Sequence, residues 1–232
     1  MKYKEGQAHF RKRIYKLVNI LYDIGRPVLK IYDISMKIRE GMLVYPGNPN
    51  PRITRYSKIP RRSTNESLIS LGSHTGTHVD AGLHVSNSGY TADMIPLRSF
   101  MGRCRVIDLT HCGNEIHGHD LKGKINRARI VLLKTNNSTK QYKRFRKDFA
   151  HVSMDAAKYL ISAGVKTMGI DYLSVKKFGT DDDVHALIIN RMTLFEGLCL
   201  RDVPGGQYTF LGLPLRIATD GAPARAILLK ET

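Results

Sequence analysis

The chain has 232 residues, of which 42% are hydrophobic, enough for one domain with a sizeable core, and it lacks the run of roughly 20 apolar residues that a membrane-spanning helix needs. Its three cysteines, Cys104, Cys112 and Cys199, form no Cys-x-x-Cys pair, and no compact apolar run follows the basic N-terminus, so we expect reduced thiols in a cytoplasmic protein without a signal peptide. The formal net charge of +17 is typical of nucleic-acid binding, but no aromatic-interleaved RNA signature or recognition-helix pattern accompanies it, so we interpret it as a solvated basic surface and do not expect nucleic acid as the main partner.

The first 27 residues are predicted to form a basic extension that precedes the main domain. Apolar residues recur at helical spacing between lysines and arginines, which predicts an amphipathic helix over residues 8–22, and Pro27 closes the extension. We expect the apolar stripe to pack on the body or on a neighbouring subunit rather than on a membrane surface. The predicted division is therefore an extension at residues 1–27 and a main domain at residues 28–232.

The main domain is predicted to belong to the α/β class. Ser153 is a good N-cap for a helix that runs through Ile161 and ends at Gly164, and a second helix is expected around residues 184–191. Short apolar runs bounded by turn signals predict strands, which dominate the first hundred residues. These strands are expected at residues 28–35, 42–45, 52–57, 68–72, 105–110, 129–135, 165–170, 208–217 and 225–229, with a turn at 46–49.

The segment from His74 to His84 concentrates four side chains that can bind a metal ion. All their intervals are even, which in an extended segment places them on one face, and Gly76 and Gly82 argue against a helix, so the expected platform is a strand that runs into a glycine-relieved turn. Three imidazoles and a carboxylate among small residues would make a poor core, so we predict a divalent-metal site here. The four side chains are those of His74, His78, Asp80 and His84.

A second group of potential ligands follows at residues 111–119. It mixes residue types at no known ligand spacing and lies among glycine and asparagine, so we interpret it as a surface loop. Asp171 is interpreted either as part of the scaffold near the metal site or as a buried structural hydrogen-bond acceptor. The members of the second group are His111, Cys112, His117 and His119.

Several separated motifs resemble the cyclase-like metal-dependent hydrolases, the family that includes bacterial kynurenine formamidase and isatin hydrolase. The segment from His74 to His84 is similar to the family signature His-x-Gly-Thr-His-x-Asp-x-Pro-x-His, with Gly82 in place of the proline, which removes a fixed φ from the turn that aims His84. The resemblance implies a single domain of the swivelling β/β/α type, to which an N-terminal helical extension is added. Further similar segments lie at residues 33–35, 44–47, 168–175, 185, 196–198, 213–215 and 220–225.

The resemblance also implies a ligand set and a mechanism. It assigns a first divalent metal to His74, His78 and Asp80, with Asp80 bridging to a second metal held by His185 and Glu196. Zn²⁺ and Mn²⁺ both suit imidazole and carboxylate donors. The interval from His185 to Glu196 is one residue shorter than in the family pattern, so either the helix end is trimmed or the pair is displaced.

His84 is implied to be the catalytic proton shuttle. An imidazole titrates near neutral pH, so it can take a proton from water and deliver it to a departing amine. A role as a third ligand, or as a partner of a ligand, is the alternative.

The function implied by the resemblance is hydrolysis of a small amide. The expected activity is that of an arylformamidase, which releases formate from N-formylkynurenine, or of a relative that acts on cyclic or aryl amides such as isatin. Tyr45, Tyr90 and Phe178 are candidate aromatic walls of the substrate pocket. A homodimer or homotetramer is expected. The competing hypotheses are a metal-binding protein without hydrolase activity and a basic nucleic-acid-binding module.

Overall fold

The computed structural model describes residues 29–140 and 144–231. The expected extension at residues 1–27, with its amphipathic helix, lies outside the described residues. None of the helices in the described part is long and apolar enough to cross a membrane.

The strands are β1 (Leu29–Asp33), β2 (Arg52–Ser57), β3 (Glu66–Ser70), β4 (His78–Asp80), β5 (Met101–Leu109), β6 (Glu115–Ile116), β7 (Ile130–Thr135), β8 (His151–Val152), β9 (Thr167–Ile170), β10 (Thr193–Glu196), β11 (Gly206–Pro214) and β12 (Gly221–Glu231). The α-helices are α2 (Gly118–Leu121), α3 (Met154–Ser162) and α4 (Val184–Arg191), and short 3-10 helices lie at η1 (Gly82–His84), η2 (Ala92–Met94), η3 (Leu97–Ser99) and η4 (Asn136–Thr139).

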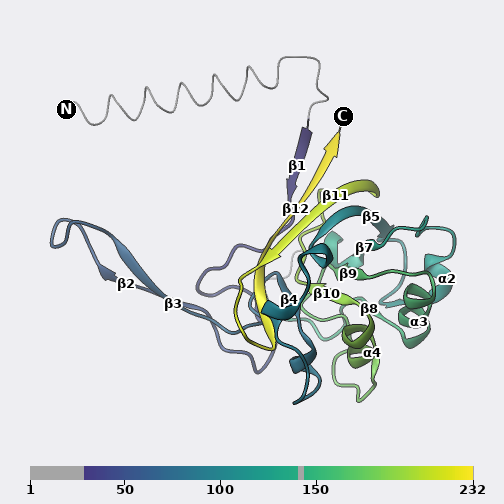
Figure 1. The fold of residues 1–232 in the computed structure, drawn as a ribbon, viewed down its shortest axis with the longest axis horizontal. Helices are drawn as coiled ribbons and strands as arrows, with labels where there is room; N and C mark the ends of the chain where they lie inside the picture. The colour runs from purple at the N-terminus through teal and green to yellow at the C-terminus, as the bar shows by residue number, and fades with distance from the viewer. Residues whose placement is uncertain (1–28, 141–143, 232) are drawn as a thin grey trace.

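The main sheet has eight strands in the order β1-β12-β11-β5-β7-β9-β10-β4, and β4 pairs additionally with β12. This extra pairing closes seven strands into a barrel-like ring, while β1 is attached to β12 alone (Figure 1). Strands β5, β7, β9 and β10 run parallel, so all four begin at one edge of the sheet and end at the other. The predicted α/β class is confirmed.

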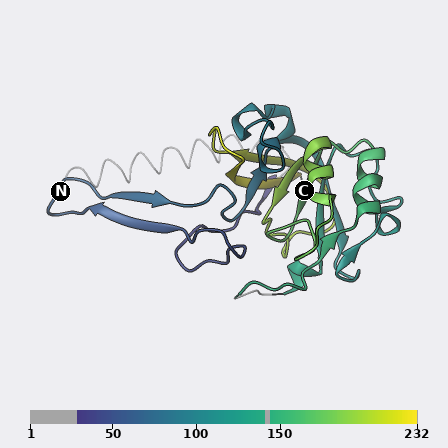
Figure 2. The same ribbon diagram turned by 90° about the horizontal axis from the view of Figure 1, so that it is seen from below.

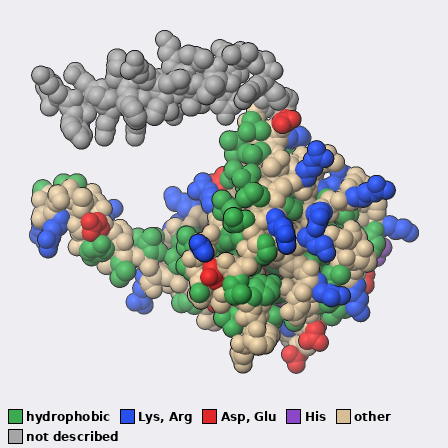
Figure 3. Space-filling model, viewed as in Figure 1, with side chains coloured by type: hydrophobic (Ala, Val, Ile, Leu, Met, Phe, Trp, Pro, Cys, Tyr) green, Lys and Arg blue, Asp and Glu red, His purple; other side chains and the backbone are tan. Residues whose placement is uncertain are grey.

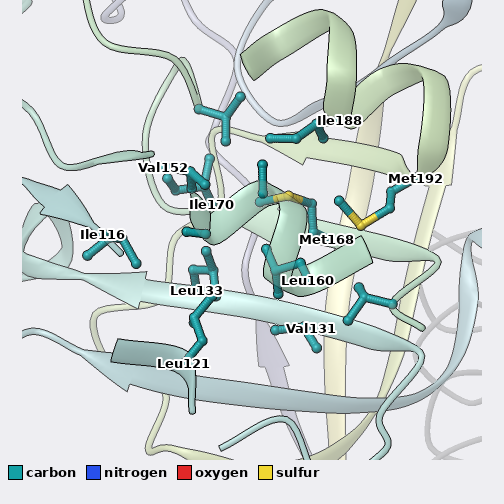
Figure 4. Packing of buried hydrophobic residues seen from close by; sticks show 14 of the residues in the cluster. Ile116, Leu121, Val131, Leu133, Val152, Leu160, Met168, Ile170, Ile188 and Met192 are labelled. Carbon is teal, nitrogen blue, oxygen red and sulfur yellow. The ribbon is translucent and has the colours of Figure 1, made fainter. Parts of the chain in front are cut away.

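Apolar side chains pack on both sides of the curved sheet. Inside the ring, Phe195 and Phe210 meet edge to face with their centroids 5.2 Å apart. Outside it, Leu160 of α3 and Ile188 of α4 pack on Met168 of β9 in a second cluster (Figure 4). Each of these side chains is fully buried, and full burial of such a side chain contributes about 1.5–3 kcal/mol. The helices are thereby fixed on the outer face of the parallel strands.

The predicted helices are confirmed. The Ser153 hydroxyl accepts a hydrogen bond from the backbone N–H of Ala156 and caps α3, which ends shortly before Gly164 at a φ of +82°. Helix α4 spans the eight residues that were expected.

The strand expected at residues 42–45 is wrong. This segment is irregular, and it is held by the side chain of Met42, which is buried against Gly76, and by a turn in which the N–H of Asn48 donates to the carbonyl of Tyr45. The apolar run therefore reflects side-chain burial without a partner strand. The predicted strand at 208–217 also ends early, at Pro214.

Strands β2 and β3 form a hairpin that stands away from the barrel (Figure 2). Nearly every side chain of the two strands is exposed, including Ile53, Tyr56, Leu68 and Ile69. A two-stranded hairpin with both faces in water is only marginally stable on its own. Its apolar faces are therefore a surface that a partner can cover.

Candidate metal centre

Strand β4 is the platform of the predicted metal site. It pairs with β10 on one side and β12 on the other, and alternate residues face opposite sides of the sheet. Val79 points into the barrel core with Phe195, so His78 and Asp80 point outward. Glu196, the last residue of β10, lies directly opposite His78 in the register.

Turns at both ends of β4 bring two further histidines to the same face. His74 lies in a turn before β4 that includes Gly76 at a φ of +69°, and His84 ends the 3-10 helix η1. The expectation that four even-spaced side chains share one face of an extended segment therefore holds for His78 and Asp80 alone. His84 converges because the strand runs into the η1 turn at Gly82, as expected, and His74 converges because a turn also precedes the strand, which the strand period does not describe.

Helix α4 supplies His185 from its first turn. The helix ends at Arg191 and β10 begins at Thr193, so a single connecting residue separates the two elements. This direct connection accommodates the short interval between His185 and Glu196, and both side chains reach the cluster.

Asp80 lies at the centre of this cluster. Its Oδ1 is 2.8 Å from His74 Nδ1 and 3.3 Å from His78 Nε2, and its Oδ2 is 2.8 Å from His185 Nε2. The Glu196 carboxylate lies 3.6 Å from His78 Nε2 and 3.7 Å from His185 Nε2, and it accepts a hydrogen bond from the backbone N–H of Val175. The structure thus brings all five predicted ligands together.

His78 provides the test of whether these residues fit a metal ion. Its Nδ1 lies 2.9 Å from the carbonyl oxygen of Gly76, which can only accept, so Nδ1 carries the hydrogen. Its Nε2 faces the carboxylates and is buried without a hydrogen-bond partner among the described residues. A buried, unpartnered imidazole nitrogen aimed at carboxylates, with its ring oriented by a carbonyl, fits a metal ligand.

The electrostatics of the cluster favour a cation. Burial lowers the pKa of His78, but the carboxylates of Asp80 and Glu196 close to its Nε2 outweigh burial and raise the pKa to about 10. Burial also lowers the pKa of His74 and of His185. The hydrogen bond that each forms with Asp80 outweighs burial, so both pKa values are raised. The pKa of Asp80 is held well below its usual range, because its bonds to the histidines outweigh burial. The carboxylates thus stabilise positive charge in the cluster. A divalent cation can supply this charge in place of the protons on the histidines.

His84 differs from the other three histidines. Its ring centroid lies 4.1 Å from that of His74 and 5.1 Å from that of His185, but its side chain is 30% exposed and makes no carboxylate contact closer than 3.6 Å. Burial lowers its pKa, and the positive charges of His74 and His185 lower it further, against the opposing effect of Asp80 and Glu196. His84 is therefore neutral at pH 7 and able to accept a proton.

Asp220 belongs to the site although the sequence analysis did not single it out. Its Oδ2 lies 2.7 Å from His74 Nε2, and its Oδ1 accepts a hydrogen bond from the Ser73 hydroxyl. The next residue, Gly221, must lack a side chain, because a Cβ there would lie 2.7 Å from the His74 ring. The signal in the sequence was its place at the start of the 220–225 segment, which matched the family's closing strands.

Asp220→Asn should weaken metal binding and lower kcat/KM by about tenfold to a hundredfold, because it removes the charge that orients the His74 ring. Metal titration and steady-state kinetics measure the two effects. Ser73→Ala removes a hydrogen-bond donor to Asp220 but leaves the charge of Asp220 in place. This variant should lose much less metal affinity and activity. Equal activity of Asp220→Asn and the wild type would show that Asp220 does not position His74.

Three donor groups in the described residues bring their atoms within 4.8 Å of one another: His74 with His78 and Asp80; Asp80 with His84 and His185; and His74 with His84 and Asp220. The first two share Asp80. None of the three draws on residues 111–119, where His117 instead contacts Asp155 and the side chain of His119 is 76% exposed.

Asp171 is a structural acceptor. It is buried and accepts hydrogen bonds from the backbone N–H groups and hydroxyls of both Thr135 and Ser138, which tie the loop after β7 to the end of β9. The segment that follows Asp171 supports the site, because the carbonyl of Tyr172 accepts from Gly197 and the N–H of Val175 donates to Glu196.

The candidate aromatic walls fall into two places. Tyr45 and Phe178 form a cluster with Phe145, with centroids 5.1 to 5.9 Å apart. Tyr90 instead lies over Gly82, where a Cβ would meet its ring carbons at 2.8 Å, and its hydroxyl donates to the carbonyl of Ile189 in α4. Glycine at position 82 therefore makes room for this ring, which ties the η1 turn to α4.

Comparisons with known proteins agree with this geometry. A family model described as putative cyclase matches residues 32–177. Kynurenine formamidases of Salinibacter ruber (strain DSM 13855 / M31) and Erythrobacter litoralis (strain HTCC2594) are each 34% identical, and the matches cover 86% of this chain and 97% and 93% of those proteins.

Solved structures show the same fold. A protein described as a potential metal-dependent hydrolase with cyclase activity superposes with a TM-score of 0.78 at 36% identity, covering 88% of this chain and 100% of that one. Isatin hydrolase A from Labrenzia aggregata superposes with a TM-score of 0.76 over 95% of this chain and 100% of its own, but at 21% identity it shows similarity of fold alone.

Proposed function

Since this chain belongs to the putative cyclase family, we propose that it is a metal-dependent hydrolase that cleaves the C–N bond of an aryl formamide such as N-formylkynurenine. Its relatives at 34% identity are kynurenine formamidases matched over nearly their whole length. The observation that carries the proposal is the convergence of three histidines and two carboxylates around Nε2 of His78, which has no hydrogen-bond partner in the part of the chain that the structure describes.

The proposed ligands divide into two sets that share one residue. His74, His78 and Asp80 would hold one divalent cation, and Asp80 with His185 and Glu196 a second, because Asp80 turns one oxygen toward each set. Zn²⁺ and Mn²⁺ both suit these donors. When bound, such a cation polarises the amide carbonyl and lowers the pKa of a water molecule.

The protein's own residues would position the substrate and move the proton. His84, neutral and more exposed than the ligands, takes a proton from water and returns it to the nitrogen of the departing amine. The cluster of Tyr45, Phe145 and Phe178 would receive the aryl group. Burial raises the pKa of Tyr45 and the charge of Glu196 raises it further, which supports a position of this ring near the proposed metal site.

The test is elemental analysis of the purified protein together with an ultraviolet assay on N-formylkynurenine and isatin. Bound divalent metal and faster turnover of N-formylkynurenine support the proposal, and faster turnover of isatin would reassign the substrate. Bound metal without turnover of any amide would identify a metal-binding protein that lacks the activity. Absence of metal with salt-sensitive RNA binding would identify a nucleic-acid-binding module.

Glu196→Gln should reduce the metal content from about two ions per chain towards one and lower activity sharply, because an amide is a weaker donor than a carboxylate. Inductively coupled plasma analysis gives the stoichiometry. Glu115→Gln, an exposed glutamate in β6, is the matched control and should change neither value. A wild type that binds one ion, and a variant that binds it unchanged, would contradict the two-metal proposal.

We also propose that the protein forms a homodimer or homotetramer that uses the β2–β3 hairpin. The argument is the exposed apolar surface that Ile53, Leu68 and Ile69 present on a hairpin that pairs with no other strand in the described part of the chain. Leu68→Lys combined with Ile69→Lys should reduce the assembly state measured by light scattering. The control is Arg61→Gln at the hairpin tip. An unchanged assembly in the double-lysine variant would remove the hairpin from the interface.

A further inference from the structure

A basic cleft of about 1650 Å³ lies at the edge of the sheet where the parallel strands begin. The metal centre lies elsewhere, because Glu196 is at the end of β10 whereas the cleft is lined by Thr193 at its start. Eight lysines and arginines line the cleft and Glu231 is the one acidic residue among its lining residues. The metal centre does not account for this surface.

Three of these cations form a row across adjacent strands. The register pairs Cys104 of β5 with Ile130 of β7, and Ile130 with Thr167 of β9. The residues immediately before these three are Arg103, Arg129 and Lys166.

The row has a spacing that follows from the sheet. Adjacent strands lie about 4.8 Å apart, so the backbone positions of the three cations span roughly 10 Å. The backbone N–H of Lys166 donates to the carbonyl of Arg129, which fixes the two residues beside each other. Arg191, the last residue of α4, adds a further cation to the lining of the cleft outside the row. The sheet itself therefore sets the separation of the three backbone positions that carry the charges.

Among the described residues, no ion pair joins any of the eight to a carboxylate within 4.0 Å. Like charges on neighbouring strands are destabilising, so the arrangement costs folding free energy unless an anion occupies it. Figure 3 shows several Lys and Arg side chains on the visible face of the barrel, with few Asp or Glu side chains between them.

A strained turn adds an independent observation at the rim of the cleft. Asn126 and Arg127 both have positive φ, at 50° and 57°, in a turn closed by the N–H of Ala128 donating to Ile125. Glycine is the usual residue where consecutive positive φ values are needed, and an arginine at such a position lowers the folding stability. Backbone strain of this kind is often found at binding sites. The turn directs a further guanidinium into the cleft.

We propose that this cleft binds a linear chain of phosphate groups, either as inorganic polyphosphate or as the polyphosphate of a nucleotide. A row of evenly spaced cations matches an extended polyanion better than a single compact anion, and guanidinium groups bind phosphate oxygens in pairs. Single-stranded nucleic acid fits less well, because its sites use aromatic platforms and Tyr90 is the one aromatic residue of the cleft that is substantially exposed. A second copy of this basic chain would bring like charge to the cleft.

The test is isothermal titration of the full-length, metal-loaded protein with tripolyphosphate, ATP, orthophosphate and a ten-nucleotide single-stranded RNA. Arg129→Gln combined with Lys166→Gln removes two charges of the row. Arg61→Gln combined with Arg62→Gln removes two exposed charges from the hairpin and is the matched control. Glu196→Gln tests whether the metal centre is the binding site instead. Thermal melting verifies that each variant is folded, and metal content verifies that the cleft and hairpin variants are loaded.

We expect tripolyphosphate to bind at least about tenfold more tightly than orthophosphate, and the cleft variant to weaken this binding by about a hundredfold. The hairpin control should change it less than about threefold, and Glu196→Gln should leave it intact. The tighter of tripolyphosphate and ATP identifies the source of the phosphate chain. Equal losses in the cleft and hairpin variants, loss in Glu196→Gln, or binding of RNA alone would each overturn the proposal.

Discussion

Asp80→Asn should abolish metal binding and lower kcat/KM by more than about a thousandfold. Asp80 is 1% exposed and contacts His74, His78 and His185, so the isosteric amide keeps the shape of the site while removing the charge that these imidazoles and any bound cation require. Metal content after gel filtration and the formamide assay measure the two losses.

The control for this experiment is another buried carboxylate. Asp171→Asn removes a charge that is bonded to Thr135 and Ser138 and should lower the melting temperature while leaving the metal content of the folded protein unchanged. If Asp80→Asn instead kept its metal at full stoichiometry, Asp80 would not be the shared ligand. The paired variants thus separate the effect of an altered metal site from that of an altered buried charge.

His84→Ala should retain the metal and lose activity by about two or more orders of magnitude, the loss expected when a general acid or base is removed. Because its pKa lies below the usual value for histidine, His84 is neutral at pH 7, and wild-type activity should fall as the pH drops through that lowered pKa. The variant should lose this dependence in its pH profile of kcat/KM.

The alternative role of His84 gives a different result. His84 also belongs to two of the donor groups, with Asp80 and His185 and with His74 and Asp220. If His84→Ala lost metal in proportion to activity, it would be a ligand. His119→Ala, on an exposed histidine outside the site, is the control for the loss of an imidazole from the surface.

Local chemistry explains which parts of the fold were predictable from the sequence. The helix at Val184–Arg191 and the N-cap at Ser153 follow from residue patterns within one element, and the structure contains both. Residues 42–45 have the apolar character of a strand but no neighbour to pair with, and sequence cannot show whether a ladder partner exists.

The site also has a part that could be predicted from the sequence and a part that could not. Residues 74 to 84 lie in one short segment, so their clustering could be predicted before the fold was known. Asp220 reaches His74 from 146 residues away, through the pairing of β12 with β4. The cations of the basic cleft are spread from residue 98 to residue 230, and only the order of the strands brings them together.

The alternation along β4 limits how this protein can change in length during evolution. Val79 faces the barrel interior while its two neighbours face the metal centre, so a slip of one residue would exchange the two sides. An imidazole and a carboxylate would then lie among phenylalanines, and a valine would stand where the ligands were. Insertions and deletions should therefore be excluded from this short strand and tolerated at the tip of the β2–β3 hairpin, where no register is shared with the barrel.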